Sequence, residues 1–411
     1  MTGSPGPPAP WSRGRGGGVL RAAVAIGVVV AACDGGTDPD GDRRPLDPVL
    51  VAEGQEIFRF DTFGDEAYWT DTLRLHEAVQ HSVSPELALQ VGLKVDVEAL
   101  PSEVVEGITS GTVDLSDPST TVALIALDAV LGVKGTVETV AGRDTLLRIG
   151  ITCALCHSTV DDAFAPGIGR RLDGWANREL NVGAIVALAP GVPGSLRQIL
   201  EGWGPGRYDP RINIDGQNTP IVIPPAYGLR DVPLETYTGE GEVSYWNAYV
   251  AVTQMHGQGS FEDSRLGISV QHTPDLVTSK LPALREYQLS LEAPSPPPGS
   301  FDAAAAERGR VVFEDDAECA RCHIPDRAFT DVASNRLHDP AETGVDPAYA
   351  QRTTQQRYRT TPLRGAWQHP PYFHDGSMAT FADVVEHYDD VLDLGLSTSQ
   401  KADLVEYLKS L

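Results

Sequence analysis

Four of the five cysteines in this chain of 411 residues lie in two C-x-x-C-H motifs, at positions 153–157 and 319–323. This spacing is the attachment signature of c-type haem. The two thiols add across the haem vinyl groups, and the histidine that follows them binds the iron. The sequence therefore predicts two covalently bound haem c groups. The predicted attachment residues and proximal ligands are Cys153, Cys156, His157, Cys319, Cys322 and His323.

Other roles for paired cysteines explain this pattern less well. A thioredoxin-like C-x-x-C needs no histidine after it and occurs in a βαβ context that is not evident here. A structural zinc site would have to join two pairs that lie far apart in the sequence, and it would leave both histidines unexplained. Disulfides within a C-x-x-C are strained and are uncommon as structural links.

The sequence before residue 49 indicates an export signal and a tether. Basic residues precede an apolar run over residues 22–33, which is too short to span a membrane, so residues 1–32 are predicted to be a signal peptide. The run ends in VAAC, which matches a bacterial lipobox and would leave Cys33 as the lipidated first residue. A plain signal peptide with an incidental cysteine is the alternative. Residues 33–48 are predicted to be a flexible acidic tether. We expect a periplasmic protein that touches a membrane only through its lipid anchor.

The formal net charge of −25 limits the partners of the chain. Nucleic acids and anionic membranes both carry phosphates, so an acidic surface disfavours binding to either. The same charge would attract small basic redox proteins, which are the predicted partners. The alternative is an acidic exterior that is merely solvated.

Each haem motif lies within a repeated sequence plan. Gly54 and Phe58 are four residues apart before the first motif, and Gly309 and Phe313 are four apart before the second. The segment EYQLSL after the first motif is echoed by EYLKSL at the end of the chain. In c-type cytochromes the first and last helices cross closely and enclose the haem. We therefore predict two cytochrome c-like haem domains.

The predicted fold class is mainly α, with the two haem domains in tandem. The first domain covers residues 49–292 and the second covers 301–411, joined by the stiff Pro-rich linker 293–300. The first domain is longer because of a large insertion at 59–152. Within the insertion, residues 120–133 are expected to be helical and buried, and their function cannot be assigned from the sequence.

The second axial ligand of each iron determines what the iron can do. Near the first haem the candidates are Met255 and its neighbour His256, and near the second they are Met378 and Tyr388. Ordinary core packing is the alternative for each of them. Two histidines of the insertion are outside candidates, His76 and His81. Three further histidines are expected at the surface, His272, His338 and His369.

Buried haem propionates need cationic partners. After the first motif the sequence offers Arg170, Arg171 and Arg178, and in the second copy it offers Arg364. Arginines on surface loops are the alternative. Two tryptophans are candidates either for electron passage between the haems or for simple packing, Trp175 and Trp246.

The C-terminal sequence TPLRGAWQHPPYFHDGSMATFADVVEHYDD, with RGRVVFEDDAECARCH before it, resembles the C-terminal haem domain of the bacterial di-haem cytochrome c peroxidase/MauG family. The match covers nearly all of residues 301–411. The resemblance implies that Tyr388 is the sixth ligand of the electron-transfer haem. It also implies a calcium ion between the two domains, for which no ligand can be named from the sequence.

The first copy resembles the family less. In the family this domain holds the peroxide-reacting haem, and a W-D-G-R stretch is followed by a carboxylate that works on the peroxide. Here Trp246 matches, Asn247 and Ala248 replace Asp and Gly, and no acidic residue occurs before Ser260. Splitting peroxide needs an acid–base group within hydrogen-bond reach. The sequence thus favours a di-haem cytochrome that carries electrons between periplasmic partners. The alternative is a peroxidase/MauG-like oxidoreductase that reduces hydrogen peroxide.

Overall fold

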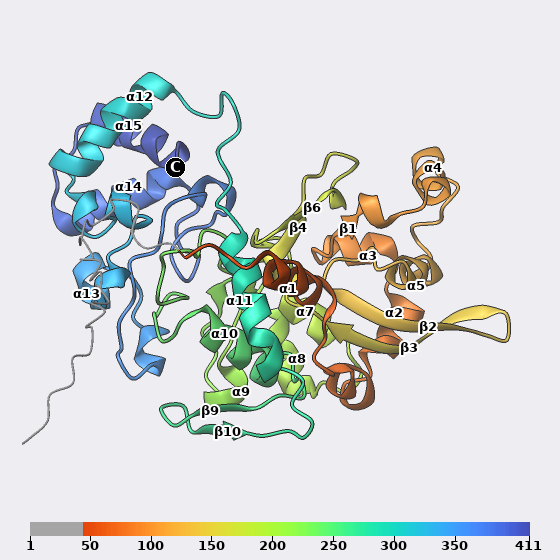
Figure 1. Cartoon of the computed structure of the whole chain (residues 1–411). Coiled ribbons are helices and arrows are strands. Elements are labelled where there is room, and N and C mark those ends of the chain that lie inside the picture. Colours follow the sequence, from red (N-terminus) through yellow and green to blue (C-terminus); the bar gives the residue numbers. More distant parts are fainter. Residues whose placement is uncertain (1–43) are drawn as a thin grey trace, which may run out of the picture. The chain divides into compact units, whose positions relative to one another are not determined.

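A computed structural model describes residues 44–411, and helices joined by irregular loops make up most of it (Figure 1). The predicted mainly α class is confirmed. Residues 46–411 form one unit. Within residues 44–411, no helix combines the length and the apolar character needed to cross a membrane. The predicted lipidation at Cys33, the signal peptide and most of the tether lie outside the described residues.

The helices fall into a long N-terminal group and a short C-terminal group on either side of the Pro-rich linker. The first group is α1 (Pro48–Phe60), α2 (Leu75–Ser82), α3 (Pro85–Gln90), α4 (Ser102–Ser110), α5 (Pro118–Ala126), α6 (Ala154–His157), α7 (Val182–Ala187), α8 (Gly194–Glu201), α9 (Ile212–Asp215), α10 (Val243–Tyr249) and α11 (Leu281–Ser290). The second group is α12 (Ala303–Val311), α13 (Pro340–Thr343), α14 (Phe381–Leu392) and α15 (Thr398–Lys409).

Shorter helical turns connect these elements. The π-helical turns are Ala67–Thr72, Val250–Gln254 and Val312–Asp316. The 3-10 turns are Val97–Ala99, Thr278–Lys280, Cys319–Arg321, Pro325–Arg327, Val332–Ser334, Ala350–Arg352 and Ala366–Gln368.

The strands form two-stranded pairs rather than a larger sheet. The longest pair is the antiparallel hairpin of β2 (Val133–Val140) and β3 (Arg143–Ile151), which leads directly into the first haem motif. The other pairs are β1 (Val95–Asp96) with β5 (Ile168–Gly169), β4 (Ser158–Val160) with β6 (Arg171–Asp173), β7 (Arg207–Tyr208) with β8 (Ile221–Val222), and β9 (Phe261–Asp263) with β10 (Ile268–Val270).

Helices α1 and α11 cross at Gly54, which lets the two backbones approach closely. A methyl group on Gly54 would lie 2.0 Å from the carbonyl oxygen of Ala283, so no larger residue fits there. One turn further along α1, Phe58 packs edge-to-face against Tyr287 of α11, with ring centroids 5.4 Å apart. Helix α1 starts at Asp47, whose side chain accepts hydrogen bonds from the first turn, with Pro48 next.

Helices α12 and α15 make the same crossing in the second copy. A methyl group on Gly309 would lie 2.0 Å from the carbonyl oxygen of Asp403, and Phe313 packs edge-to-face against Tyr407 at 5.2 Å. The glycine–phenylalanine pairs that repeat in the sequence thus lie at two equivalent helix crossings. Figure 1 shows α12 and α15 side by side.

The insertion at 59–152 contains α2 to α5 and the β2–β3 hairpin, and it shares a hydrophobic core with residues 155–223 that follow it. The segment 120–133 is buried as predicted, but only its first part is helical, because α5 ends at Ala126. Asp128 then adopts a left-handed backbone conformation, with φ of 55°. This conformation is incompatible with continuing an α-helix, so the chain turns towards β2.

Replacing Gly309 with Ala is expected to lower the free energy of unfolding by about 1–3 kcal/mol, because the added methyl group would overpack the α12–α15 crossing. The matched control is Gly194→Ala in the first turn of α8, where a methyl group meets nothing within 4 Å. The control should change stability by only about 0.5 kcal/mol. Urea denaturation of the haem-loaded chain measures both, and equal stabilities would contradict the close crossing.

Candidate haem sites

The first motif forms the single turn of α6, which follows the end of β3. The Nδ1 atom of His157 lies 3.0 Å from the carbonyl oxygen of Pro224. In the tautomer that donates this hydrogen bond, Nε2 keeps its lone pair for a metal. Burial lowers the pKa of His157 to about 4, so the ring is neutral, as a metal ligand must be.

The second motif repeats this arrangement on a different local structure. Cys319–Arg321 forms a 3-10 turn, and the Nδ1 atom of His323 lies 3.1 Å from the carbonyl oxygen of Phe329. Burial also lowers the pKa of His323 to about 4. In the tautomer that donates from Nδ1, each histidine is oriented by a backbone acceptor and keeps Nε2 as the ligand atom.

The four described cysteines are free thiols. Burial raises the pKa of Cys153 and of Cys156 to about 12 and that of Cys319 to about 11. Each motif thus presents two unpaired thiols beside a neutral, oriented imidazole. This donor set fits covalent haem c at both motifs.

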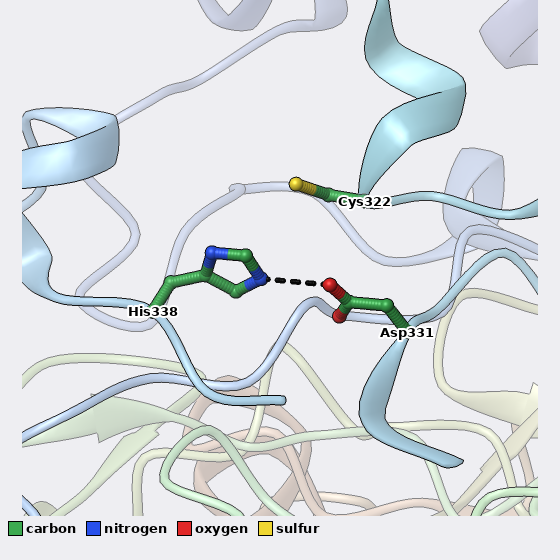
Figure 2. Close-up of side chains that lie close together, drawn as sticks. All are labelled: Cys322, Asp331 and His338. Carbon is green, nitrogen blue, oxygen red and sulfur yellow. Dashed lines mark hydrogen bonds and ion pairs between the residues drawn. The ribbon is translucent and has the colours of Figure 1, made fainter. Parts of the chain in front are cut away.

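Cys322 also lies close to Asp331 and His338 (Figure 2). The ligand atoms of these three residues lie within 4.8 Å of one another. If Cys322 forms a haem thioether, its sulfur is no longer a free thiolate ligand, and the three residues would then belong to the surroundings of the predicted second haem. A second cluster with metal-like spacing consists of the acidic residues Glu386, Asp389 and Asp390. Lys401 already forms ion pairs with two of them, Glu386 and Asp389.

The expectation that His338 and His369 lie at the surface is wrong. His338 is only 6% exposed. Its Nε2 atom lies 3.0 Å from a carboxylate oxygen of Asp331 (Figure 2), and its Nδ1 atom lies 3.0 Å from one of Glu342. The Cys322 thiol, together with the two carboxylates, raises the pKa of His338 to about 9. His369 is buried beside Arg178.

The three other histidines named from the sequence differ in exposure. His272 is exposed as expected, and His81 is exposed on α2. His76 is half-buried on the same helix.

The sixth-ligand candidates near the first motif lie at the end of the π-helical turn Val250–Gln254. Met255 is buried in the core cluster against which Cys153 also packs. His256 has a φ of 62°, and its ring stacks on Tyr68 at a centroid distance of 3.6 Å. Met255 therefore lies in the core around the first motif, while His256 is engaged by the insertion.

In the second copy, Tyr388 lies on α14 close to the haem-attachment thiols. Burial, with added repulsion from Cys319 and Cys322, raises the pKa of the Tyr388 hydroxyl. Met378 is partly exposed and pairs through its backbone with Tyr372. The choice between Tyr388 and Met378 stays a prediction, and the position of Tyr388 supports it as the ligand.

The predicted propionate partners have different surroundings. Arg170 is exposed and lies 3.5 Å from Asp161, and Arg171 is buried in an ion pair with Asp96 at 3.1 Å. Arg364 is exposed. Arg178 contacts a backbone carbonyl oxygen, that of Pro371 at 3.4 Å. Their role in binding propionates stays a prediction.

The two tryptophans also differ. Trp175 packs edge-to-face on Trp367 at 5.7 Å, and Trp367 packs on the core cluster that contains Cys319 at its edge. Trp246 is buried on α10 against Tyr249. Trp175 thus contacts the second copy, whereas Trp246 packs inside the first.

Sequence reasoning missed Asp65, a fully buried carboxyl group beside the first motif. Its two oxygens accept from the backbone N–H of Ile151, two residues before Cys153, at 3.3 and 3.2 Å. Burial, with repulsion from Glu66 and Asp61, raises the pKa of Asp65 to about 9. Asp65 therefore carries a proton at neutral pH. No local pattern marks it, because its burial comes from contacts distant in sequence.

The loop that carries Asp65 also contacts the sixth-ligand candidates of the first copy. The indole N–H of Trp69 donates to the carbonyl oxygen of Met255 at 3.0 Å, and Tyr68 stacks on His256. The start of the insertion, residues 61–72, therefore lies between the strand that leads into the first motif and the Met255–His256 turn.

Comparisons with known proteins find relatives over part of the chain. A methylamine utilization protein MauG of Methylophilus methylotrophus is 30% identical over 123 residues, which cover 26% of this chain and 36% of that protein. The MauG protein of Methylorubrum extorquens is 28% identical over 156 residues, which cover 33% of this chain and 43% of that protein. The chain thus spans less than half the length of these relatives. No family model matches. The resemblance to the di-haem cytochrome c peroxidase/MauG family is confirmed.

Two solved structures show weak likeness. Hydrazine synthase of Kuenenia stuttgartiensis has a TM-score of 0.34 at 21% identity, covering 47% of this chain and 73% of that one. A MauG-like protein associated with microbial copper homeostasis has a TM-score of 0.26 at 19% identity, covering 34% and 54%. At these TM-scores the likeness supports no conclusion.

The buried proton of Asp65 predicts a pH-dependent stability. The native state holds this proton up to about pH 9, whereas an unfolded Asp loses it near pH 4, so the contribution of Asp65 to stability falls as pH rises between these values. Relative to wild type, Asp65→Asn should gain stability from pH 5 to pH 9 in urea titrations. Asp71→Asn, which removes an exposed carboxylate paired with Arg148, should not show this trend.

Proposed function

We propose that this chain is an exported di-haem c-type oxidoreductase of the peroxidase/MauG class that reduces hydrogen peroxide. Reducing one peroxide to two waters takes two electrons and two protons. Bound haem c supplies reversible one-electron chemistry through its iron. The protein must hold both haems, pass electrons between them and provide protons near the peroxide-reacting haem.

The buried carboxyl of Asp65 is the observation that carries this proposal. The stretch 247–260 contains no acidic residue, which counted against an enzyme. Asp65 comes from the insertion instead, and its loop contacts both the segment before Cys153 and the Met255–His256 turn. A carboxyl group that is protonated at neutral pH is the kind of acid that peroxide reduction needs.

The contact between Trp175 and Trp367 supports electron passage between the two copies. Trp175 follows the first motif, and Trp367 lies at the edge of the core around the second. In this proposal His323 and Tyr388 hold the electron-relay haem, and His157 holds the peroxide-reacting haem. The two MauG relatives favour the same class.

An electron carrier without peroxidase activity is the second candidate. The observation that favours it is Met255, whose buried side chain shares a core cluster with Cys153 and Ala154. A thioether bound to the first iron would close it to peroxide. The chain would then move electrons between periplasmic redox proteins.

The cellular setting belongs to the same proposal. We place the chain in the periplasm, with a lipid on Cys33 as its membrane anchor and small basic redox proteins as partners. The acidic net charge supports such partners. The calcium ion between the two copies also stays a proposal. Of the two clusters with metal-ligand spacing among residues 44–411, one contains the predicted haem-attachment residue Cys322, and the other already forms ion pairs with Lys401.

Low-temperature EPR of the oxidised holo-protein, with and without hydrogen peroxide, tests the choice of function. The enzyme predicts one high-spin haem signal that peroxide converts to an oxidised species, because one iron has an open position. Two low-spin signals that peroxide leaves unchanged would exclude the enzyme and support the electron carrier.

Asp65→Asn should slow the reaction with peroxide by tenfold or more, because general acids contribute about 10²–10⁴-fold to rates. Wild-type activity should fall as pH rises towards 9, where Asp65 loses its proton, and the residual activity of the variant should not follow this profile. Stopped-flow absorbance measures both. Asp71→Asn is the control and should keep the wild-type profile, because Asp71 is an exposed carboxylate on the same loop that pairs with Arg148. A variant with wild-type rate and profile would remove Asp65 from the reaction.

A further inference from the structure

The guanidinium of Arg178 is enclosed at the boundary between the two copies. Its Nη1 atom donates to the carbonyl oxygen of Pro371, and its Nη2 atom lies 3.4 Å from Nδ1 of His369. Both partners belong to the second copy, whereas Arg178 follows the first haem motif. The Nε–H group is buried and has no hydrogen-bond partner within residues 44–411.

The groups around Arg178 do not neutralise its charge. Burial, with repulsion from Arg178, lowers the pKa of His369 to about 3, so this ring is a neutral acceptor. The other side chains that its charge acts on are phenols with pKa values raised by burial, of Tyr227, Tyr237 and Tyr372. The part of the chain that the structure describes gives Arg178 no Asp or Glu in ion-pair contact.

Four other arginines, with side chains at most 7% exposed, do have carboxylates. The pairs are Arg171 with Asp96, Arg211 with Glu240, Arg352 with Asp209, and Arg359 with Glu235. A guanidinium stays charged in proteins, and leaving such a charge buried without a counter-ion is costly. Arg178 differs from these four arginines in having no carboxylate partner. We therefore look outside the polypeptide for the anion that balances its charge.

The surroundings of Arg178 place it beside both predicted haem sites. The backbone N–H of Asn177, its neighbour, donates to the carbonyl oxygen of Cys156 at 2.9 Å. On the other side, Tyr372 packs on the core cluster of the second motif. Arg178 is therefore close enough to both predicted haem sites for a propionate of either haem to contact it.

We propose that Arg178, with His369 and the three phenols around it, forms a buried anion site for a haem propionate. The proposal rests on the proposed haem content of the chain. Arg178 offers its unpaired Nε–H and a planar set of donors that suits a carboxylate. Because its other partners belong to the second copy, the same contact would link one haem to both copies.

This site has an electrostatic consequence for the haem concerned. A fixed positive charge disfavours the oxidised haem, which carries one more positive charge than the reduced haem, and so raises its reduction potential. The same charge keeps the propionate ionised at lower pH.

The test is a spectroelectrochemical titration of the holo-protein between pH 5 and pH 9. Arg178→Gln should lower the reduction potential of one haem at high pH, where a tenfold change in the equilibrium corresponds to about 59 mV. Without the arginine charge the pKa of the propionate should rise. The pH range in which the potential of that haem varies with pH should therefore move upwards, a change that loss of packing alone would not produce. The haem that responds identifies the source of the propionate.

Arg143→Gln is the matched control, since Arg143 is exposed at the start of β3 and has no predicted role in binding a haem. It should leave both potentials unchanged. If Arg178→Gln does not assemble, Arg178→Lys keeps the charge but loses the planar donors, and it should shift the same potential by less. Unchanged potentials and pH profiles for both haems in the assembled Arg178 variant would overturn the proposal.

Haem content is measured first, on the wild-type protein. Absence of two covalent haems would refute the proposed function itself. If the wild-type protein holds two haems and substitution of Arg178 changes neither reduction potential, only the anion site is refuted.

Discussion

The close approach of helix backbones at Gly54 and Gly309 is the constraint on which the rest of the structure depends. Each glycine faces a carbonyl oxygen of the partner helix at a distance that excludes any side chain. The crossing brings Phe58 against Tyr287 and Phe313 against Tyr407, and so closes the beginning of each copy onto its end. The C-x-x-C-H motifs lie between these ends in sequence, so both attachment turns are held within a framework of packed helices.

Many buried charges within residues 44–411 form ion pairs, and two buried groups for which no ion pair is found, Asp65 and Arg178, lie near the predicted haem motifs. Asp65 avoids an uncompensated charge by keeping its proton, which a carboxyl group can do at neutral pH. Arg178 has no such escape, because a guanidinium does not lose its proton in a protein. One group therefore points to proton supply and the other to an anionic cofactor group.

The insertion changes the functional interpretation of the first copy. Judged by the stretch 247–260 alone, the chain lacks the acid–base group of a peroxide-reacting haem. The loop at 61–72 supplies a buried carboxyl from another part of the chain and at the same time contacts the Met255–His256 turn. In the proposed enzyme, the insertion would supply the acid that the stretch 247–260 lacks.

The sequence by itself determined the haem-attachment motifs, the mainly helical class and the repeated Gly–Phe pairs, because these depend on local spacing. It also pointed to Tyr388 through a resemblance that the relatives support. Only the tertiary structure decided that Asp65 is buried, that His338 and His369 are not at the surface, and that Arg178 lacks a carboxylate. The physical reason is that desolvation and charge pairing depend on partners far away in the sequence. Asp65 accepts from Ile151, 86 positions further along the chain, and Arg178 contacts Pro371, 193 positions further along. The carboxylates that pair with His338, of Asp331 and Glu342, are by contrast within seven residues of it.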